Sequence, residues 1–452
     1  MRKTTIITDP IHQVMNLGSD PKLRKALKTV IDTRAFQRLR RISQLGLTSY
    51  VFPGATHTRF SHSLGAAYLA HSVLMHLREW VEESDRKNIR QHFNDVIIAA
   101  LLHDVGHGPF SHSFEQVLKR YSWAPTHEDW TATLIANPSA EIHQSLNKCN
   151  LDPPKIASAL DKSASADFPR PYRQIVSSQL DVDRMDYLIR DSHFAGVAIG
   201  RFDTQYLINS LVIVSHSEHQ DTKTLGLTPK GVKAYEAFLL ARQLMNRTVY
   251  YHHNVKVLEF MIEHLIRLTI QYVSQLTADS GISAFIPPYF HRVAKAIEAG
   301  NMSKEQFMHE SQADYVRLTE DVIWVLVSAL AESTAVPIAQ SFAQRILTRD
   351  ILPHFIIKTG KKELLEESLI AGGLHHDTDF HIVDLRTTMY KRNGQEGVFI
   401  LDWEGHINEV AEHSETISAL RDRPEAESLL IIIDVTKKED IERIAKDNQF
   451  VD

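Results

Sequence analysis

The sequence has almost no cysteine: Cys149 stands alone among 452 residues. A single cysteine excludes an intrachain disulfide and a cysteine-based zinc site, and it suits a reducing cytosol. Long apolar runs are also missing, since the two longest, residues 96–102 and 429–433, are far shorter than the ~20 residues that cross a bilayer. The first residues lead into no apolar segment of a secretory signal. These absences predict a cytoplasmic protein.

The chain also lacks an excess of positive charge, because 56 acidic residues outnumber 50 basic ones and give a formal net charge of −6. This balance argues against bulk electrostatic attraction to nucleic acid. An anionic substrate would therefore need a local basic pocket. With 43% hydrophobic and 23% charged residues the composition is that of a globular protein, and the length allows more than one structural unit.

Apolar residues recur mostly at the 3–4 spacing of amphipathic helices. Helices are predicted at residues 20–41, 63–81, 94–102, 231–251, 256–276 and 321–330. A stretch rich in proline and serine, 152–171, is predicted to be an irregular connector. Short strands are predicted at 380–385, 397–402 and 428–435, followed by a charged helix at 438–448. The fold class is therefore mainly α: a helical body of residues 1–370, with its metal core at about 31–260, and a small α/β region at 371–452.

Histidine is the residue in excess, with 25 histidines against 18 glycines. Drift across a large surface accounts for most of them. A cluster of eight between His57 and His112 stands apart. Within it, residues 101–112 read Leu-Leu-His-Asp-Val-Gly-His-Gly-Pro-Phe-Ser-His. The vicinal His103 and Asp104 offer one nitrogen and one oxygen ligand at the end of an apolar helix, and the glycines and proline let the later histidines fold back toward them.

A divalent cation bound by imidazole and carboxylate needs about four protein ligands, with positions left for water and substrate. His103 and Asp104 give two of these ligands. The other two are predicted to be His62, near the start of a predicted helix, and Asp183, in an acidic cluster of a helical segment. Any one of these histidines alone is more often structural than a ligand. The order His62, His103-Asp104, Asp183 is the pattern of the HD-domain metal-dependent phosphohydrolases. The donor set suits Fe, Mn, Co, Ni or Zn, with Mg or Mn accompanying a polyphosphate substrate.

Further motifs resemble the deoxynucleoside triphosphate triphosphohydrolase branch of that superfamily, which includes the dGTPases. They are Ile31-Asp-Thr33, Phe36-Gln-Arg-Leu-Arg40, Gln44-Leu-Gly46, Tyr50 through Phe60, Thr126-His-Glu128 and Asp181 through Tyr187, with Asp9-Pro-Ile-His12 upstream and a weaker echo at Leu318 through Asp321. Within the branch the chain is most similar to the SAM-and-HD-domain dNTPases, although it carries no SAM domain. The resemblance covers residues 6–330 and is most specific at 31–128.

The resemblance implies an enzyme that hydrolyses a dNTP to deoxynucleoside and intact triphosphate. His112 is then the general acid at the 5′ oxygen and Glu115 the carboxylate that poises it, while His107, His127 and Glu128 complete the proton-transfer network. A hydrogen bond in a loop is the structural alternative for His127.

Substrate-binding residues also follow from the resemblance. Arg59, Arg184 and Arg242 match a phosphate clamp, and Arg184 departs from the lysine common in relatives. Gln44 and Asp191 match positions that bind the 3′ hydroxyl, and Leu45 and Tyr250 match those that crowd the 2′ position. The same set includes Tyr187; for this residue and for Tyr250, an ordinary place in the core is the alternative.

A regulatory nucleotide site is implied as well. Asp32, Gln37 and Arg40 match residues that read guanine in an activating GTP or dNTP, and Val51 and Phe52 match its neighbours. Thr5 stands where relatives carry a phosphate-binding lysine, which weighs against triphosphate binding there. In the structural alternative Asp32 caps a helix and Arg40 forms surface pairs. The resemblance further implies a homo-oligomer, dimer or tetramer.

Two other functions remain open from the sequence. One is an HD phosphohydrolase acting on nucleoside monophosphates, cyclic or oligonucleotides, or single-stranded nucleic acid. The other is a catalytically idle nucleotide sensor or scaffold. The set of Gln44, Leu45, Arg59 and Tyr250 favours a triphosphate substrate.

Overall fold

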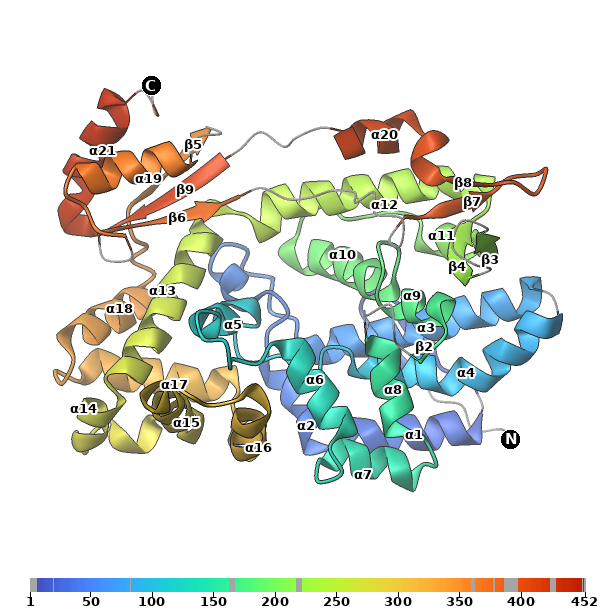
Figure 1. The fold of residues 1–452 in the computed structure, drawn as a ribbon, viewed down its shortest axis with the longest axis horizontal. Coiled ribbons are helices and arrows are strands. Elements are labelled where there is room, and N and C mark those ends of the chain that lie inside the picture. The colour runs from blue at the N-terminus through green and yellow to red at the C-terminus, as the bar shows by residue number, and fades with distance from the viewer. Residues whose placement is uncertain are drawn as a thin grey trace.

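The computed structural model describes residues 6–18, 20–81, 83–161, 167–216, 222–358, 362–376, 379–385, 397–422, 428–448 and 450. Helices dominate, which confirms the predicted mainly α fold class (Figure 1). The first half of the chain contains α1 (Pro21–Ile31), α2 (Arg34–Gln37), α3 (Arg59–Trp80), α4 (Glu83–Leu102), α5 (His112–Leu118), α6 (His127–Ala136), α7 (Glu141–Lys148), α8 (Pro153–Leu160), α9 (Arg170–Val176), α10 (Val182–Ala195) and α11 (Thr204–Ile208).

The second half continues with longer helices and a mixed α/β end. Its helices are α12 (Val232–Met245), α13 (His253–Gln271), α14 (Val273–Ala278), α15 (Pro288–Ala299), α16 (Lys304–Tyr315), α17 (Glu320–Glu332), α18 (Pro337–Thr348), α19 (Lys362–Ala371), α20 (Glu415–Asp422) and α21 (Lys438–Asp447). The strands are β1 (Ile6–Asp9), β2 (Gln13–Asn16), β3 (Leu211–His216), β4 (Thr222–Leu227), β5 (His354–Lys358), β6 (Phe380–Asp384), β7 (Phe399–Leu401), β8 (Ile407–Glu409) and β9 (Ser428–Ile433).

Two of the secondary-structure predictions are wrong, one for a helix and one for a connector. The helix predicted at 20–41 is broken, because Asp32 ends α1 and the Thr33 hydroxyl accepts a hydrogen bond from the Phe36 backbone N–H to cap α2. The connector predicted at 152–171 contains α8, whose N-terminus begins with two prolines and is capped by Asp152. Proline is tolerated in a first helical turn, where its missing N–H has no intrahelical partner anyway.

Three apolar clusters form the interior. The first gathers α3, α4, α10 and α12, and the second gathers α13 with α15, α17 and α18. A third lies within the C-terminal sheet, ordered β5-β9-β6, and its helices α19 and α21. Figure 1 shows α12 and α13 running between these regions.

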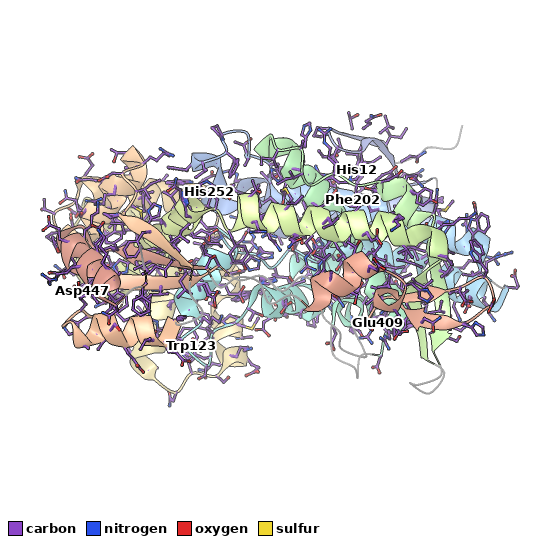
Figure 2. All side chains as sticks on the ribbon, turned by 90° about the horizontal axis from the view of Figure 1, so that it is seen from above. His12, Trp123, Phe202, His252, Glu409 and Asp447 are labelled. Atoms are coloured by element: carbon purple, nitrogen blue, oxygen red, sulfur yellow. The ribbon has the colours of Figure 1, made fainter. Side chains whose placement is uncertain are left out.

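The C-terminal residues lie in two separate places. Strands β7 and β8 join the β3–β4 hairpin in one sheet, where β7 runs parallel to β4 and pairs Leu227 with Ile400. Glu409 of β8 and Asp447 of α21 accordingly lie toward opposite ends of the molecule (Figure 2). Strand β5 precedes residue 371 yet belongs to the C-terminal sheet. The division of the chain at residue 370 into two domains stays a prediction.

Among the described residues no single helix is long and apolar enough to cross a membrane. In the described part of the chain, one pair of helices, α17 and α18, meets the length and composition requirement when the two are joined, and this pair is bent by 119° at the break between them.

Candidate metal centre and surrounding pocket

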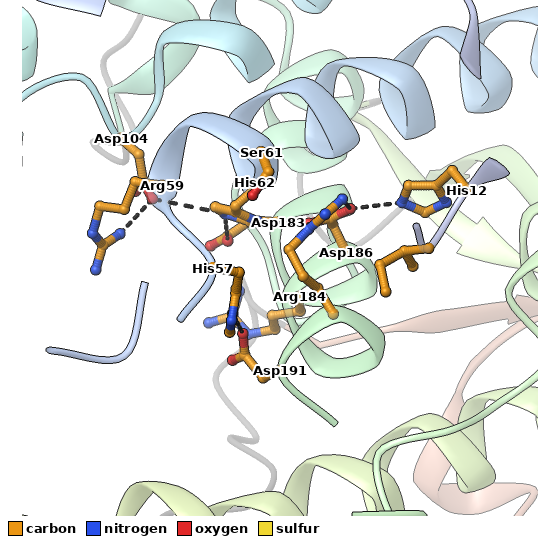
Figure 3. Close-up of polar contacts among 12 residues, drawn as sticks. His12, His57, Arg59, Ser61, His62, Asp104, Asp183, Arg184, Asp186 and Asp191 are labelled. Carbon is orange, nitrogen blue, oxygen red and sulfur yellow. Dashed lines mark hydrogen bonds and ion pairs between the residues drawn. The ribbon is translucent and has the colours of Figure 1, made fainter. Parts of the chain in front are cut away.

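Helices α3, α4 and α10 meet at one point and carry the four predicted metal ligands. His62 lies in the first turns of α3, His103 and Asp104 follow the end of α4, and Asp183 lies in the first turn of α10. A glycine in α3 allows the close approach, because a Cβ on Gly65 would lie 1.9 Å from an oxygen of Asp186 in α10. Figure 3 shows His62, Asp104 and Asp183 of this cluster together with Asp186.

The ligand atoms converge on a common space. His62 Nε2 lies 3.0 Å from Asp183 Oδ1, 3.2 Å from His103 Nε2 and 3.7 Å from Asp104 Oδ2. His103 Nε2 lies 3.4 Å from Asp104 Oδ1 and 3.5 Å from Asp183 Oδ1. Two donors that each sit ~2.1 Å from a tetrahedral ion are about 3.4 Å apart, so this donor set fits a divalent cation.

Contacts behind the histidines fix which nitrogen faces the centre. His62 Nδ1 lies 2.8 Å from Asp186 Oδ2, and His103 Nδ1 lies 2.7 Å from the carbonyl oxygen of Ala100. Such outer partners orient ligating imidazoles and strengthen them as ligands. The arrangement leaves both Nε2 atoms for a metal, which strengthens the fit.

Electrostatics at this centre favour positive charge. Burial lowers the pKa of His62, but hydrogen bonds with Asp183 and Asp186 outweigh it and raise the pKa to about 10. Burial raises the pKa of Asp183, but His103 and His62 bring it well below its usual range. Burial also raises the pKa of Asp104, and there the charge of Arg59 brings it well below its usual range. Both carboxylates are therefore ionised, as metal ligands must be.

Sequence reasoning missed Asp186 as a positioning residue. Its fully buried carboxylate accepts from Arg190 Nε at 2.8 Å and lies 2.6 Å from His12 Nε2. Arg190 in turn reaches Asp9 at 2.8 Å. The available signal was helical spacing: Asp186 follows Asp183 by three residues and so shares its side of α10.

The predicted acid-base residues form a second group beside the metal centre. His127 Nδ1 lies 2.8 Å from Glu115 Oε2, and His112 Nδ1 lies 3.8 Å from the same oxygen. The rings of His107 and His127 stack at 4.0 Å, while His107 Nε2 lies 3.3 Å from Asp104 Oδ1. His107 therefore connects the two groups.

Helix α6 begins with a capping box that places His127. The Thr126 hydroxyl accepts from the Asp129 N–H, and the Asp129 carboxylate accepts from the Thr126 N–H. Lys304 of α16 holds the same carboxylate at 2.9 Å. Glu128, the other member of the predicted network, is exposed on α6, and its role stays a prediction.

The three predicted phosphate-binding arginines differ in their surroundings. Arg59 is buried, contacts Asp104 and donates to Ser111 Oγ at 2.7 Å, so it borders both groups. Arg184 contacts Asp181 and the Ser178 carbonyl. The charges of Arg184 and Arg242 both act on Tyr187, whose pKa burial raises to about 12.

Around Asp191 the predicted sugar-binding residues come together. Its two carboxylate oxygens lie 2.7 Å from His57 Nε2 and 2.7 Å from the Tyr250 hydroxyl. The sequence pattern did not predict the contact between His57 and Asp191, because 134 residues separate the two. Gln44 Oε1 is buried and has no hydrogen-bond partner among the described residues. Leu45 and Tyr250 both pack against the first apolar cluster.

The residues predicted to read a regulatory nucleotide make contacts within the chain. Arg40 Nε donates to Gln37 Oε1 at 2.8 Å and its guanidinium covers the Phe60 ring at 3.5 Å. Asp32 is the C-cap residue of α1, as the structural alternative predicts. Val51 and Phe52 follow the 3-10 helix η2 (Gly46–Tyr50). Thr5 lies outside the described residues, and the regulatory site stays a prediction.

Comparison with known protein families identifies the domain that carries this centre. Residues 59–191 match the HD domain, and residues 202–280 match the HD associated region. The chain is an HD-domain protein. All four predicted metal ligands lie within the matched HD domain, and His62, His103 and Asp183 form a candidate metal-binding group there.

Curated relatives support this assignment. The HD-domain chain is 28% identical to the uncharacterized protein YwfO of Bacillus subtilis over 92% of its own length and 89% of that protein. It is 33% identical to a SAMHD1 homolog of Dictyostelium discoideum and 32% identical to SAMHD1 of Gallus gallus, both named deoxynucleoside triphosphate triphosphohydrolases. These matches cover 58% and 57% of the chain but only 48% and 44% of the relatives, less than half of their length.

Solved structures share the whole architecture. A phosphohydrolase from Bacteroides thetaiotaomicron superposes with a TM-score of 0.72 at 26% identity, covering 96% of this chain and 100% of that one. A hypothetical protein from Aquifex aeolicus gives a TM-score of 0.69 at 24% identity, covering 98% and 100%, and shows the fold alone.

Proposed function

We propose that this HD-domain protein hydrolyses deoxynucleoside triphosphates to a deoxynucleoside and triphosphate. The observation that carries the proposal is the Asp191 carboxylate, held by His57 and Tyr250 beside the metal centre, together with the unpartnered Gln44 Oε1. These two acceptors suit a sugar hydroxyl, which needs an acceptor for its proton. The SAMHD1 relatives, named for this reaction, support the same substrate class.

The roles proposed for the residues rest on the family resemblance, and their positions are consistent with these roles. His62, His103, Asp104 and Asp183 hold the cation, which when bound supplies Lewis acidity at the phosphate adjoining the sugar. Arg59 lies between the metal and acid-base groups, where a fixed cation stabilises charge that develops on phosphoryl oxygens.

The acid-base residues complete the proposed reaction. His112 donates a proton to the departing 5′ oxygen, since its exposed ring is open to a substrate, and Glu115 holds its other nitrogen. Half-burial raises the pKa of Glu115, but hydrogen bonds with His112 and His127 bring it well below its usual range, so the carboxylate is ionised.

Discrimination between sugars follows from the apolar side of the pocket. Leu45 packs against the apolar cluster and offers no partner to a 2′ hydroxyl. A ribose hydroxyl buried there without a partner costs about 1–3 kcal/mol, which corresponds to roughly a 5- to 150-fold preference for the deoxyribonucleotide.

The test is a metal-reconstituted assay with the four dNTPs, the matching NTPs and a short single-stranded oligonucleotide. We expect triphosphate release from dNTPs, slow turnover of NTPs, and none after His103→Ala combined with Asp104→Ala. Product from the oligonucleotide alone would contradict the proposal, and GTP turnover as fast as that of dGTP would contradict the sugar discrimination.

Regulation and assembly complete the proposal. A GTP or dNTP activator would bind near Asp32, Gln37 and Arg40, and the active form would be a homo-oligomer. A GTP titration that leaves the rate of dNTP hydrolysis unchanged would contradict the nucleotide activation. Light scattering that gives a monomer with and without nucleotide would contradict the homo-oligomer.

A further inference from the structure

The acid-base group contains a second set of metal-binding atoms. One ligand atom from each of His112, Glu115 and His127 lies within 4.8 Å of the other two. Glu115 Oε2 is 2.8 Å from His127 Nδ1 and 3.8 Å from His112 Nδ1. These separations bracket the roughly 3.4 Å expected between two ligands of one tetrahedral ion. A shift of a few tenths of an ångström at each side chain would therefore admit a cation.

The three side chains are held in place before any ion arrives. His112 and Glu115 share one side of α5 through their three-residue spacing. His127 is the first residue of α6, which the capping box of Thr126 and Asp129 fixes. Prior ordering of ligands lowers the entropy lost on binding and so raises the affinity for the ion.

The surroundings select the kind of ion and leave it a path. The His112 side chain is 71% exposed, so an ion can enter from solvent and keep water in its remaining positions. Two imidazole nitrogens and one carboxylate oxygen suit Zn, Co or Ni, whereas Mg prefers oxygen ligands alone.

This set is separate from the HD metal centre. His107 lies between the two, with its ring stacked on His127 and its Nε2 3.3 Å from Asp104. No residue contributes a ligand to both groups.

We propose that His112, Glu115 and His127 form a second, inhibitory site for a divalent transition metal such as Zn²⁺. A cation there takes the lone pairs of His112 Nδ1, His127 Nδ1 and a Glu115 oxygen. Each ring then carries its single proton at Nε2, and any further proton that had faced Glu115 is released to solvent. The binding stands on geometry alone. Its consequence, inhibition by excess Zn²⁺, rests on the proposed function, because that function uses the same side chains as acid and base.

Metal stoichiometry tests the binding. After chelator treatment, the full chain is dialysed against micromolar Zn²⁺, and bound metal is counted by atomic emission. We expect two tight equivalents in the unaltered protein and one each in Glu115→Gln, His112→Ala, and the double variant His103→Ala, Asp104→Ala. His309→Ala, which removes an exposed histidine of α16, should retain two.

Two features keep the result interpretable. His112 is mostly exposed and glutamine is isosteric with glutamate, so both variants should keep the melting temperature of the unaltered chain. Replacing Zn²⁺ by Co²⁺ adds a visible absorption band for each site, and the loss of one band identifies the site removed. One equivalent in the unaltered protein, or two in Glu115→Gln, would overturn the second site.

Activity separates this proposal from the proposed function. Turnover of a dNTP is measured first at one equivalent of Zn²⁺, which loads the HD centre, and then at several equivalents. We expect turnover at one equivalent and at least a tenfold loss once the second site fills. Two bound equivalents in the stoichiometry measurement, with no dNTP turnover even at one equivalent, would contradict the proposed function and leave the second site standing. Turnover that excess Zn²⁺ leaves unchanged would contradict the inhibition.

Discussion

Asp186 positions His62 of the candidate metal centre although it is not one of the predicted ligands. Its carboxylate is fully buried and faces His62, His12 and Arg190. Burial raises its pKa, but Arg190 and the two histidines bring it well below its usual range. The charge therefore persists at neutral pH and holds His62 in the orientation a metal requires.

Asp186→Asn should weaken metal binding by about 10–100-fold, the usual effect of removing an outer partner of a ligand. It should also lower the free energy of unfolding by about 1–3 kcal/mol, because Arg190 keeps only the charge of Asp9. Competition with a chromophoric chelator and urea titration measure the two effects. Asp321→Asn, which removes an exposed partner of Arg41, is the control and should change neither by much.

Glu263 gives the chain a stability that depends on pH. Burial and the neighbouring charge of Glu259 raise its pKa to about 8, against 4.5 for an ordinary glutamate. Since the folded pKa lies above the unfolded one, the folded state binds the proton more tightly, and its stability falls as pH rises from about 4.5 to 8.

Glu263→Gln should remove that part of the pH dependence, because an amide does not ionise. We expect the urea midpoint of the variant to exceed that of the unaltered protein at pH 8.5 and to approach it at pH 5. Glu305→Gln, an exposed position of α16, should follow the unaltered curve. A difference between Glu263→Gln and the unaltered protein that does not vary with pH would contradict the raised pKa.

At the scale of elements, the metal centre depends on how closely α3 and α10 approach. An added Cβ at Gly65 would lie 1.9 Å from Asp186 Oδ1 and 2.6 Å from a guanidinium nitrogen of Arg190. Alanine normally favours a helix over glycine by about 1 kcal/mol. Here the steric conflict outweighs that preference, since both opposing side chains are buried and held by hydrogen bonds.

Gly65→Ala should therefore lower stability by about 1–3 kcal/mol, as overpacking does, and reduce metal affinity through the displaced Asp186. Thermal unfolding with and without bound metal measures both. Gly281→Ala meets only the Asp279 carboxylate at 3.3 Å and should behave nearly as the unaltered chain does. Equal behaviour of the two variants would show that α3 and α10 tolerate a methyl group between them.

Elements with strong local signals were predictable, and those with weak signals were not. The end of α4 and the strands β6 and β9 follow from apolar period and composition. Helix α8 was missed because its prolines read as a loop, although both occupy the first turn. Strand β5 was missed because the described strand that pairs with it, β9, lies about 70 residues further along the chain.

At the scale of the whole molecule, the chain returns to the helical body between β6 and β9, two strands of its C-terminal sheet. Ile400 of β7 is 1% exposed and belongs to the same apolar cluster as α3, α4 and α10. Ser414 also donates to Glu236 of α12 at 2.6 Å. The segment from β7 to α20 is therefore part of the body in its packing.

Ile400→Ala should lower the free energy of unfolding by about 2–5 kcal/mol, the range for truncating a buried aliphatic residue. Ile356→Ala on β5, where the side chain is 43% exposed, should cost much less. Urea unfolding followed by circular dichroism distinguishes them. Similar small costs would mean that β7 contributes little to the body.

The sequence by itself determined the helical fold class and the presence of the HD motif. Helical period is a local property, and the adjacent His103-Asp104 with the following glycine-rich turn lies within a dozen residues. The predicted ligands His62 and Asp183 were reached through the family pattern.

Only the tertiary structure decided what surrounds that motif. Asp186 faces His62 across 124 residues of chain, and His57 faces Asp191 across 134. No periodicity relates positions so far apart, because their approach is set by how α3 packs on α10. The parallel pairing of β7 with β4 has the same cause, since apolar burial in the body, rather than any local preference, brings the two strands together.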